Sequence, residues 1–481
     1  MAKKEKFVIG DEGIHDASVL GFPKMLVLGV QHTFAMFGAT VLVPLLTGLD
    51  VATTLLMAGL GTLFFHLVTK GKVPAFLGSS FAFLGGYAAI APKLADGSPN
   101  KEMLPYACLG VAVAGLIYLV FALLIKVIGI KKVMKFFPPV VTGPIIIAIG
   151  LSLAGSAVDN CKTCWPLALV ALAIVIIFNI WGKGMAKIVP ILLGIVGASI
   201  IAIILVLTTG EIIQTLDENG NVIAEFWAIN GNPNLKLCDV SAWKAFVDAS
   251  WIGLPIHKEA TIFGVDFSQT SKVVSSIIAI APIALATMME HIGDISAIGA
   301  TCGRNFISNP GLHRTLIGDG VATTLASLVG APANTTYGEN TGVLALSKVY
   351  DPKVVRIAAV TAVVLSLSPK FAALISLIPT AIIGGISFIL YGMISGIGVR
   401  NVVENKVDFS KSRNLIVAAV ILVCALGLGS ISFTVGKVGI TLTALAVAAI
   451  AGIVLNAILP GNDYVFEAES YDNAKKSKGD K

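Results

Sequence analysis

Apolar runs of about 20 residues recur from one end of this chain to the other, and a run of that length lets a helix cross a bilayer. Only 13% of the 481 residues are charged, whereas a soluble domain carries about 25%, so the charges are too few to cover a water-facing surface. The sequence therefore predicts an all-α polytopic membrane protein of about 14 spans. The clearest runs are residues 25–46, 106–125, 167–181, 188–207, 415–427 and 442–459.

The basic residues lie in alternate loops and form no stripe, so the net charge of +6 does not indicate a nucleic-acid partner. The positive-inside rule places such loops in the cytoplasm, which puts both termini on the cytoplasmic side. The intervening connections, such as residues 96–102 and 217–238, are acidic or neutral and are expected outside. The basic loops contain Lys70 and Lys72; Lys126, Lys131, Lys132 and Lys135; Lys183 and Lys187; Arg304 and Arg314; Lys348, Lys353 and Arg356; and Arg400, Lys406, Lys411 and Arg413.

Two short segments resemble each other: residues 79–83 read SSFAF and residues 335–339 read TTYGE, each shortly after a Pro-Ala pair. Other landmarks recur in the same order, namely Gln31-His32 as Glu290-His291 and Pro138 before Gly143 as Pro379 before Gly384. Chance matches among common residues explain this shared order poorly. A duplicated unit of about seven spans is predicted, and an odd number of spans makes the second copy inverted in the membrane.

Residues 74–80 and 332–336 are too short and too rich in Gly and hydroxyl groups for a membrane helix. We expect each to be an extended piece that reaches mid-membrane, followed by a half-helix that begins near Phe81 or near Gly338. Irregular backbone at this depth is tolerated only where protein buries it or where it lines a cavity. The half-helices would direct free N–H groups toward the protein centre. The Ser and Thr side chains are expected mainly to cap these helices and secondarily to contact a ligand.

Acidic residues lie where a membrane span should exclude them. Glu290 follows the apolar residues 277–289, Asp294 lies four residues later on the same helical face, and Glu339 opens the second half-helix. An ionisable residue within a span costs about 2.5–3.5 kcal/mol and is by default a functional hypothesis. The alternative is a structural ion pair, but no Lys or Arg lies near these acids in sequence.

The remaining polar and aromatic candidates allow two interpretations each. His32 and Asp294 could exchange protons or could tie helices together, and Asp319 is expected to serve helix packing. Aromatic residues in spans usually pack. Phe81 and Tyr337, at matched positions of the two segments, are nevertheless expected to face a flat ligand from either side.

This inventory favours a small, neutral, planar ligand with N–H and C=O edges. Sulfate or bicarbonate would require Lys or Arg in place of two Glu residues. A channel would need a continuous wet pore, and an enzyme would need a nucleophile and base at a recognisable spacing, which is not found. No metal site is predicted, because the Cys161-x-x-Cys164 motif lacks a second pair and is expected to be incidental or a local disulfide.

Four segments resemble the nucleobase–ascorbate transporter family, especially its bacterial uracil permeases: residues 31–44 (QHTFAMFGATVLVP), 78–83 (GSSFAF), 290–294 (EHIGD) and 334–348 (NTTYGENTGVLALSK). The resemblance covers nearly the whole chain. It implies fourteen spans in two inverted repeats, core and gate domains, a homodimer in the bacterial cytoplasmic membrane, and proton-driven uptake of a nucleobase without a further cofactor. Uracil is the expected substrate, and a purine such as xanthine or urate is the alternative.

The resemblance also implies residue roles. Glu290 and Glu339 would hold the N–H groups of uracil, backbone N–H groups at Phe81 and Gly338 would meet a carbonyl, and Phe81 would lie against the ring. Tyr337 and Tyr391 match aromatic positions near the site, and His32 matches a histidine of the coupling network. Some uracil permeases carry His where this chain has Asp294, so the group that holds the coupling proton is left open among His32, Glu290, Asp294 and Glu339. Ser347 replaces a frequent Thr and retains a hydroxyl.

The resulting division of the chain has seven parts. They are a cytoplasmic segment (1–20), the first half of the core domain (21–135), the first half of the gate domain (136–208), an extracytoplasmic connector (209–271), the second half of the core domain (272–377), the second half of the gate domain (378–460) and a cytoplasmic tail (461–481). The connector is expected to hold a turn at residues 217–221 and an interfacial helix at residues 240–251.

Overall fold

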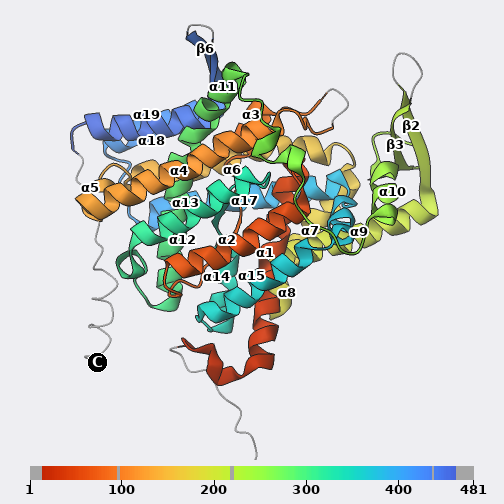
Figure 1. Cartoon of the computed structure of the whole chain (residues 1–481), viewed down its shortest axis with the longest axis horizontal. Helices are drawn as coiled ribbons and strands as arrows, with labels where there is room; N and C mark the ends of the chain where they lie inside the picture. Colours follow the sequence, from red (N-terminus) through yellow and green to blue (C-terminus); the bar gives the residue numbers. More distant parts are fainter. Residues whose placement is uncertain (1–12, 95–97, 217–221, 436–437, 462–481) are drawn as a thin grey trace, which may run out of the picture.

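The computed structural model describes residues 13–94, 98–216, 222–435 and 438–461, and it is mostly helical (Figure 1). Within these residues seven helical segments are long and apolar enough to cross a membrane, or eight if one bent pair is counted as a span. A multi-pass helical membrane protein is thereby confirmed. The seven segments are α1 (Phe22–Thr47), α2 (Val51–Val68), α4 (Leu104–Ile128), α6 (Pro139–Cys161), α9 (Pro190–Thr209), the continuous pair α11 (Thr270–Ile280) and α12 (Ala284–Cys302), and α17 (Thr380–Glu404).

Shorter helices complete the bundle. The bent pair is α15 (Pro352–Ser366) and α16 (Pro369–Ser376), which meet at 89° where Pro369 starts a new helix. The shorter apolar helices are α7 (Trp165–Trp181), α18 (Ser412–Gly427) and α19 (Ala444–Ile458), and α13 (Leu312–Leu328) is a more polar helix of similar length. The short helical turns are η1 (Ala17–Leu20), α5 (Ile130–Met134), α8 (Met185–Ile188), η2 (Lys258–Ala260), η3 (Ile262–Gly264), η4 (Ala281–Ile283) and η5 (Ile307–Gly311).

Two broken segments lie within the bundle, as predicted. The first broken segment (residues 74–90) contains strand β1 (Leu77–Ser79) and half-helix α3 (Leu84–Ile90), and the second (residues 332–347) contains β5 (Asn334–Thr336) and α14 (Gly338–Ser347). The strands pair antiparallel, with Gly78 opposite Thr335. Because both strands are fully buried, this pairing supplies backbone hydrogen bonds that water cannot supply there.

The half-helices begin at different points relative to the shared motif. α14 begins at Gly338, as expected, whereas α3 begins at Leu84 rather than near Phe81. The N–H of Leu84 closes a turn onto the carbonyl of Phe81 at 3.1 Å, so the residues after Phe81 form a turn before the helix proper.

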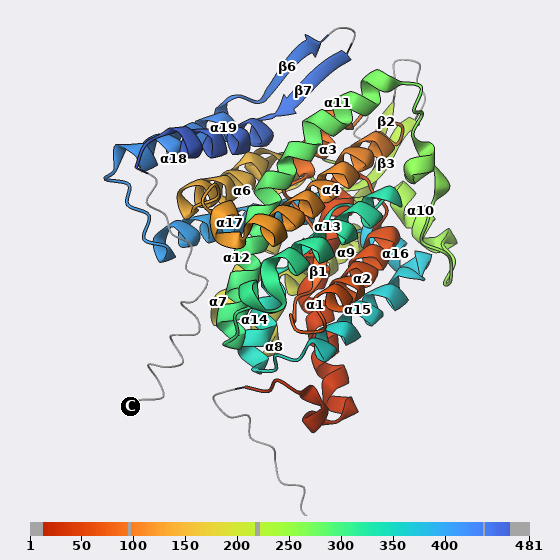
Figure 2. The same ribbon diagram turned by 60° about the vertical axis from the view of Figure 1, so that its left-hand side comes forward.

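The helices form two groups. One contains α1, α2, α4 and α11–α15: α13 packs on α4 and α2, α15 packs on α2 and α1, and α11 packs on α4. The other contains α6, α7, α9 and α17–α19. In this group α6 packs closely on α17, α6 also contacts α18 and α19, and α17 also contacts α7 and α9. Figures 1 and 2 place α18 and α19 at the left edge of the molecule, opposite the strands β2 and β3.

Two β-structures extend from the bundle. The connector holds a three-stranded sheet of β2 (Gly210–Leu216), β3 (Val222–Ile229) and β4 (Lys236–Asp239), followed by α10 (Val240–Asp248), which confirms the predicted helix. The predicted turn at residues 217–221 lies outside the described residues. The hairpin of β6 (Ser430–Val435) and β7 (Val438–Thr443) was not predicted, although its β-branched and aromatic composition favours strands.

The structure corrects one expectation about the cysteines. Cys161 and Cys164 are both buried free thiols, so they form no local disulfide. Cys161 ends α6 and Cys164 precedes α7, which places them at a helix–helix corner. The predicted cytoplasmic ends fall partly outside the described residues, which begin at Gly13 and end at Gly461.

Candidate functional site

Helix α12 carries acidic residues in the middle of the bundle. Glu290 and Asp294 are partly exposed, although Met289 and Ile295 beside them are buried. Their spacing of one helical turn places both on the face that packs toward α14. No Lys or Arg forms an ion pair with Glu290, Asp294 or Glu339 within the described residues. The alternative of a structural ion pair to these acids is therefore excluded for that part of the chain.

The start of α14 meets this acidic face. Thr336 donates its hydroxyl proton to Asp294 Oδ2 at 2.9 Å. A Cβ atom built on Gly338 would find Asp294 Oδ1 at 3.9 Å as its sole neighbour within 4 Å. Gly338 is itself exposed between the buried residues Tyr337 and Asn340, so an open space lies in front of it. This space, bordered by α12 and α14, is the candidate site.

Acceptors and donors both remain available at the site. Glu290 lies close enough to Glu339 for their charges to interact, and its Oε2 atom is buried without a hydrogen-bond partner among the described residues. In the same part of the chain, the backbone N–H groups of Phe81 and Gly338 also have no partner. Buried polar atoms are normally paired, so the unpartnered Glu290 Oε2 atom makes this space a candidate ligand site.

The predicted aromatic residues separate into two roles. The rings of Phe81 and Tyr391 meet edge to face, with centroids 6.1 Å apart, and this contact joins the first broken segment to α17. The ring of Tyr337 instead lies over Gly78, where an added Cβ would come within 2.4 Å of it, and its hydroxyl donates to the Ser79 carbonyl at 3.0 Å. Tyr337 therefore holds the two broken segments together, and its expected position against a ligand opposite Phe81 stays a prediction.

His32 contacts an amide rather than a carboxylate. This buried residue of α1 has its Nδ1 atom 3.1 Å from Asn340 Nδ2, and the same amide donates to the His32 carbonyl at 3.2 Å. The contact ties α1 to the first turn of α14. We did not predict this pairing. The signal available in the sequence was an Asn next to Glu339 at the start of a half-helix.

A second polar pair lies behind the acidic face. His291 Nδ1 is 2.8 Å from Asp319 Oδ2, and both side chains are fully buried. This pair ties α12 to α13, which confirms the expected packing role of Asp319. One turn before Glu290, Thr287 accepts a 2.5 Å hydrogen bond from Tyr118 of α4. These contacts fix the orientation of α12 and so direct Glu290 and Asp294 toward α14.

Comparisons with known proteins identify relatives of this chain. The family described as "Permease family" matches residues 23–432. The chain is 40% identical to the uracil permease of Bacillus subtilis (strain 168), over 90% of this chain and 91% of that protein. It is 37% identical to the putative pyrimidine permease RutG of Escherichia coli (strain K12), over 92% of this chain and 90% of that protein.

Solved structures share the fold at much lower identity. The transmembrane domain of a cyanobacterium bicarbonate transporter, BicA, aligns with a TM-score of 0.60 and 16% identity, over 92% of this chain and 99% of that one. SLC26A9 aligns with a TM-score of 0.60 and 10% identity, over 92% of this chain and 66% of that one. Identities this low establish a common fold and nothing about the function or the substrate.

Proposed function

Because the chain belongs to the nucleobase–ascorbate transporter family, whose members are transporters and not enzymes, we propose that it imports uracil across the membrane. Relatives at 40% and 39% identity are named uracil permeases. The observation that carries the proposal is the buried, unpartnered Glu290 Oε2 atom, which lies near Glu339 and the open N–H groups of Phe81 and Gly338. Uracil is planar and neutral, and it presents N–H and C=O groups along its edge.

The binding pose follows from hydrogen-bond complementarity. Glu290 and Glu339 accept the N–H groups of uracil, and the backbone N–H groups of Phe81 and Gly338 donate to a carbonyl. The Phe81 ring covers one face of the base, held in place by Tyr391. A carboxylate acceptor strengthens such bonds to roughly twice the neutral value. An anionic substrate would instead meet like charges from the acidic side chains, which opposes its binding.

We further propose fourteen spans in two inverted repeats. The broken segments count as one span each, and the remaining spans are α1, α2, α4, α6, α7, α9, α11–α12, α13, α15–α16, α17, α18 and α19. Matching contacts in the two halves support this arrangement: α13 packs on α4 as α15 packs on α2, and α7 packs on α9 as α18 packs on α19. The antiparallel pairing of Gly78 with Thr335 also fits a two-fold relation between the repeats. Residues 79 and 335 occupy the same place in the repeated motif, so the two copies of the motif pair with each other at equivalent positions.

Alternating access would move the two helix groups against each other. The group with α1 and α12 holds the acids and corresponds to the proposed core domain, and the group with α6 and α17 corresponds to the proposed gate domain. Phe81 and Tyr391 meet at the junction, so the substrate would lie where the groups separate. We assign a homodimer in a bacterial cytoplasmic membrane, with both termini in the cytoplasm.

Proton coupling is assigned to the carboxyl groups at the site. Three of them, Glu290, Asp294 and Glu339, border the space between α12 and α14, close enough to share one proton. Uracil binding would change their surroundings and so link proton binding to substrate binding. His32 would act through Asn340, which shares the first turn of α14 with Glu339.

Uptake of radiolabelled uracil into proteoliposomes tests the proposal. Wild-type protein should accumulate uracil faster with an inward proton gradient, and Glu290→Gln should abolish accumulation while the protein remains monodisperse. Uptake that does not depend on the proton gradient would exclude proton coupling. Uptake of radiolabelled xanthine or urate that unlabelled uracil does not inhibit would instead identify a purine carrier.

A further inference from the structure

The described N-terminal residues 13–20, here called the N-terminal strap, lie against the chain that follows α14. Ile14 donates its N–H to the carbonyl of Lys348 at 2.7 Å and accepts the N–H of Tyr350 at 2.7 Å. These bonds make a parallel bridge between Ile14 and Val349. The strap thus adds a short strand to the connection between α14 and α15.

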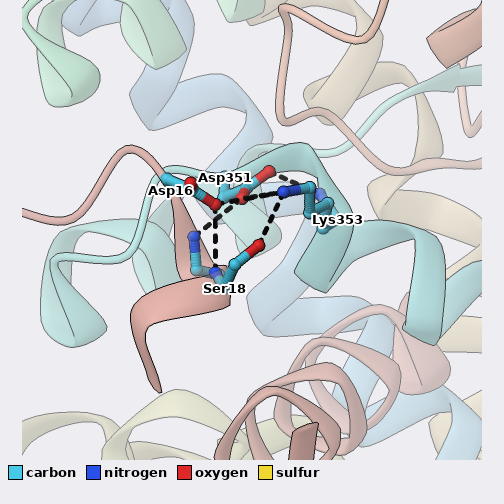
Figure 3. A network of polar contacts seen from close by, with 5 residues as sticks. Asp16, Ser18, Asp351 and Lys353 are labelled. Atoms are coloured by element: carbon cyan, nitrogen blue, oxygen red, sulfur yellow. Dashed lines mark hydrogen bonds and ion pairs between the residues drawn. The ribbon is translucent and has the colours of Figure 1, made fainter. Parts of the chain in front are cut away.

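Polar contacts fasten the strap to the start of α15, and Figure 3 shows them converging. The buried carboxylate of Asp351 accepts the N–H of Ala17 at 2.7 Å and also caps α15 through the N–H of Lys353. The Lys353 ammonium group donates to Asp16 at 3.0 Å and to Ser18 at 2.8 Å. The Lys353 ammonium and the Ser18 groups hold the pKa of Asp16 at about 2.

A small apolar cluster lies beneath these contacts. Ile14 and Ala17 of the strap are buried against Val349 and Val354 of the α14–α15 connection and α15. Leu20, Met25 and Leu28, which lead into α1 and lie along it, pack around the cluster. It is separate from the main core of the bundle. The strap is therefore held by a few local contacts rather than by the core.

The strap lies at the far end of the helix that carries Glu339. Lys348 ends α14 in a left-handed conformation with φ of 51°, and its N–H bonds to the Leu344 carbonyl. α14 has only ten residues, so its first turn and its last turn are close together. Asn340 ties the first turn to His32 of α1, and Ile14 ties the last turn to the strap that precedes α1. One continuous stretch of chain thus holds α14 at both ends.

The contacts that hold the strap contribute little to the free energy of folding. The side chains of Asp16 and Lys353 are both exposed, by 64% and 45%, and exposed ion pairs contribute little to stability. The apolar cluster has four buried members, which must offset the conformational entropy of the ordered strap. Release of the strap should therefore be possible without unfolding of the bundle.

We propose that the N-terminal strap positions α14, so that its release lets Glu339 move and weakens uracil binding. Ile14, Ala17 and Asp351 are the positioning residues, and none of them borders the candidate site. This inference rests on the proposed function only for its transport readout.

The test compares Ala17→Lys with Val19→Lys. Ala17 is fully buried in the cluster, so a lysine there must displace the strap, whereas Val19 is 58% exposed and accepts the same charge without displacement. Hydrogen exchange measured on the full chain should show lost protection at residues 338–347 in Ala17→Lys alone. The uracil KM of that variant should rise about fivefold, the low end of typical coupling between sites, with Vmax unchanged.

A second variant guards against misfolding. Asp351→Asn retains a capping side chain for α15 but removes the negative charge that accepts the Ala17 N–H and attracts Lys353. Like Ala17→Lys, it should therefore reduce the hydrogen-exchange protection of residues 338–347. Unchanged exchange in α14 after the strap is released would overturn the proposal, as would equal effects in Val19→Lys. If the wild-type protein transports no uracil, the proposed function fails, and the exchange data still decide whether the strap positions α14.

Discussion

The two broken segments share a sequence pattern but use opposite members of their hydroxyl pairs. In the first broken segment Ser79 donates to the Thr40 carbonyl of α1 at 2.9 Å, and Ser80 has a buried hydroxyl without a partner in the described chain. In the second, Thr336 donates to Asp294 of α12, and Thr335 is the one without a described partner. The same motif thus anchors one segment to backbone and connects the other to an acid.

This difference assigns separate tasks to the two segments. The first contributes an aromatic wall and an open N–H group, and its last motif position is the buried Phe83. The second carries Glu339 at the corresponding position and contacts both Asp294 and His32 through its side chains. The shared pattern therefore supplies two similar half-helices, and differences in a few side chains place the polar groups on one of them.

The largest expected effect is at the position where the motifs differ most. Glu339→Gln should weaken uracil binding about 10- to 150-fold, because a hydrogen bond to a charged group contributes about 1.5–3 kcal/mol. Phe83→Leu at the matched position should bind uracil like the wild type, with only a modest loss of stability. Isothermal titration in detergent measures both. Equal losses in the two variants would contradict the division of tasks.

Substitutions at the second hydroxyl of each motif should produce a smaller difference in uracil affinity. Thr336→Val removes the donor to Asp294 and should weaken uracil binding about fivefold, the effect of roughly 1 kcal/mol. Ser80→Ala removes a hydroxyl that has no described partner and should leave affinity unchanged. Uracil-dependent thermal shifts of the purified variants provide the measurement. A stronger effect of Ser80→Ala would mean that the first segment contacts the ligand through this side chain.

The first hydroxyl should affect stability rather than binding. Ser79→Ala removes the anchor to α1 and should destabilise the protein by about 1 kcal/mol, whereas Thr335→Val replaces a buried hydroxyl without a described partner and should be neutral or stabilising. Equilibrium unfolding in mixed detergent micelles compares them. The contrast fails if Thr335→Val is the more damaging change.

The smallest expected effect concerns the strap at the end of the second broken segment. The pKa of Asp16 is lowered from 3.8 to about 2 by the Lys353 and Ser18 contacts, so its contribution is complete above pH 4 and is lost as pH falls through 2. Asp16 raises the pKa of Lys353, whose contribution is lost only at strongly alkaline pH. The Asp16–Lys353 contact should therefore stay constant from pH 5 to pH 8. A change in the protease sensitivity of residues 13–20 within that range would require another group, and His15 of the strap, whose ring lies 5.3 Å from that of Tyr350, is the one to replace as a control.

Sequence reasoning located the broken segments because Gly, Pro and hydroxyl residues cannot continue a membrane helix. It also brought Glu290, Asp294, Gly338 and Glu339 into one site, and the structure places them around a common space. It could not foresee that Tyr337 would lie over Gly78, since that contact joins residues far apart in the chain. The strap and the His32–Asn340 contact were missed for the same reason.

The amino-acid sequence by itself determined that this chain spans a membrane many times and that carboxyl groups lie within it, because hydrophobicity and helix-breaking residues act locally. Tertiary structure decided which of two similar hydroxyls receives a partner, which aromatic ring lies over Gly78 and which helix end the N-terminus holds. Those outcomes depend on distances between segments far apart in sequence, and such distances exist only once the helices have packed.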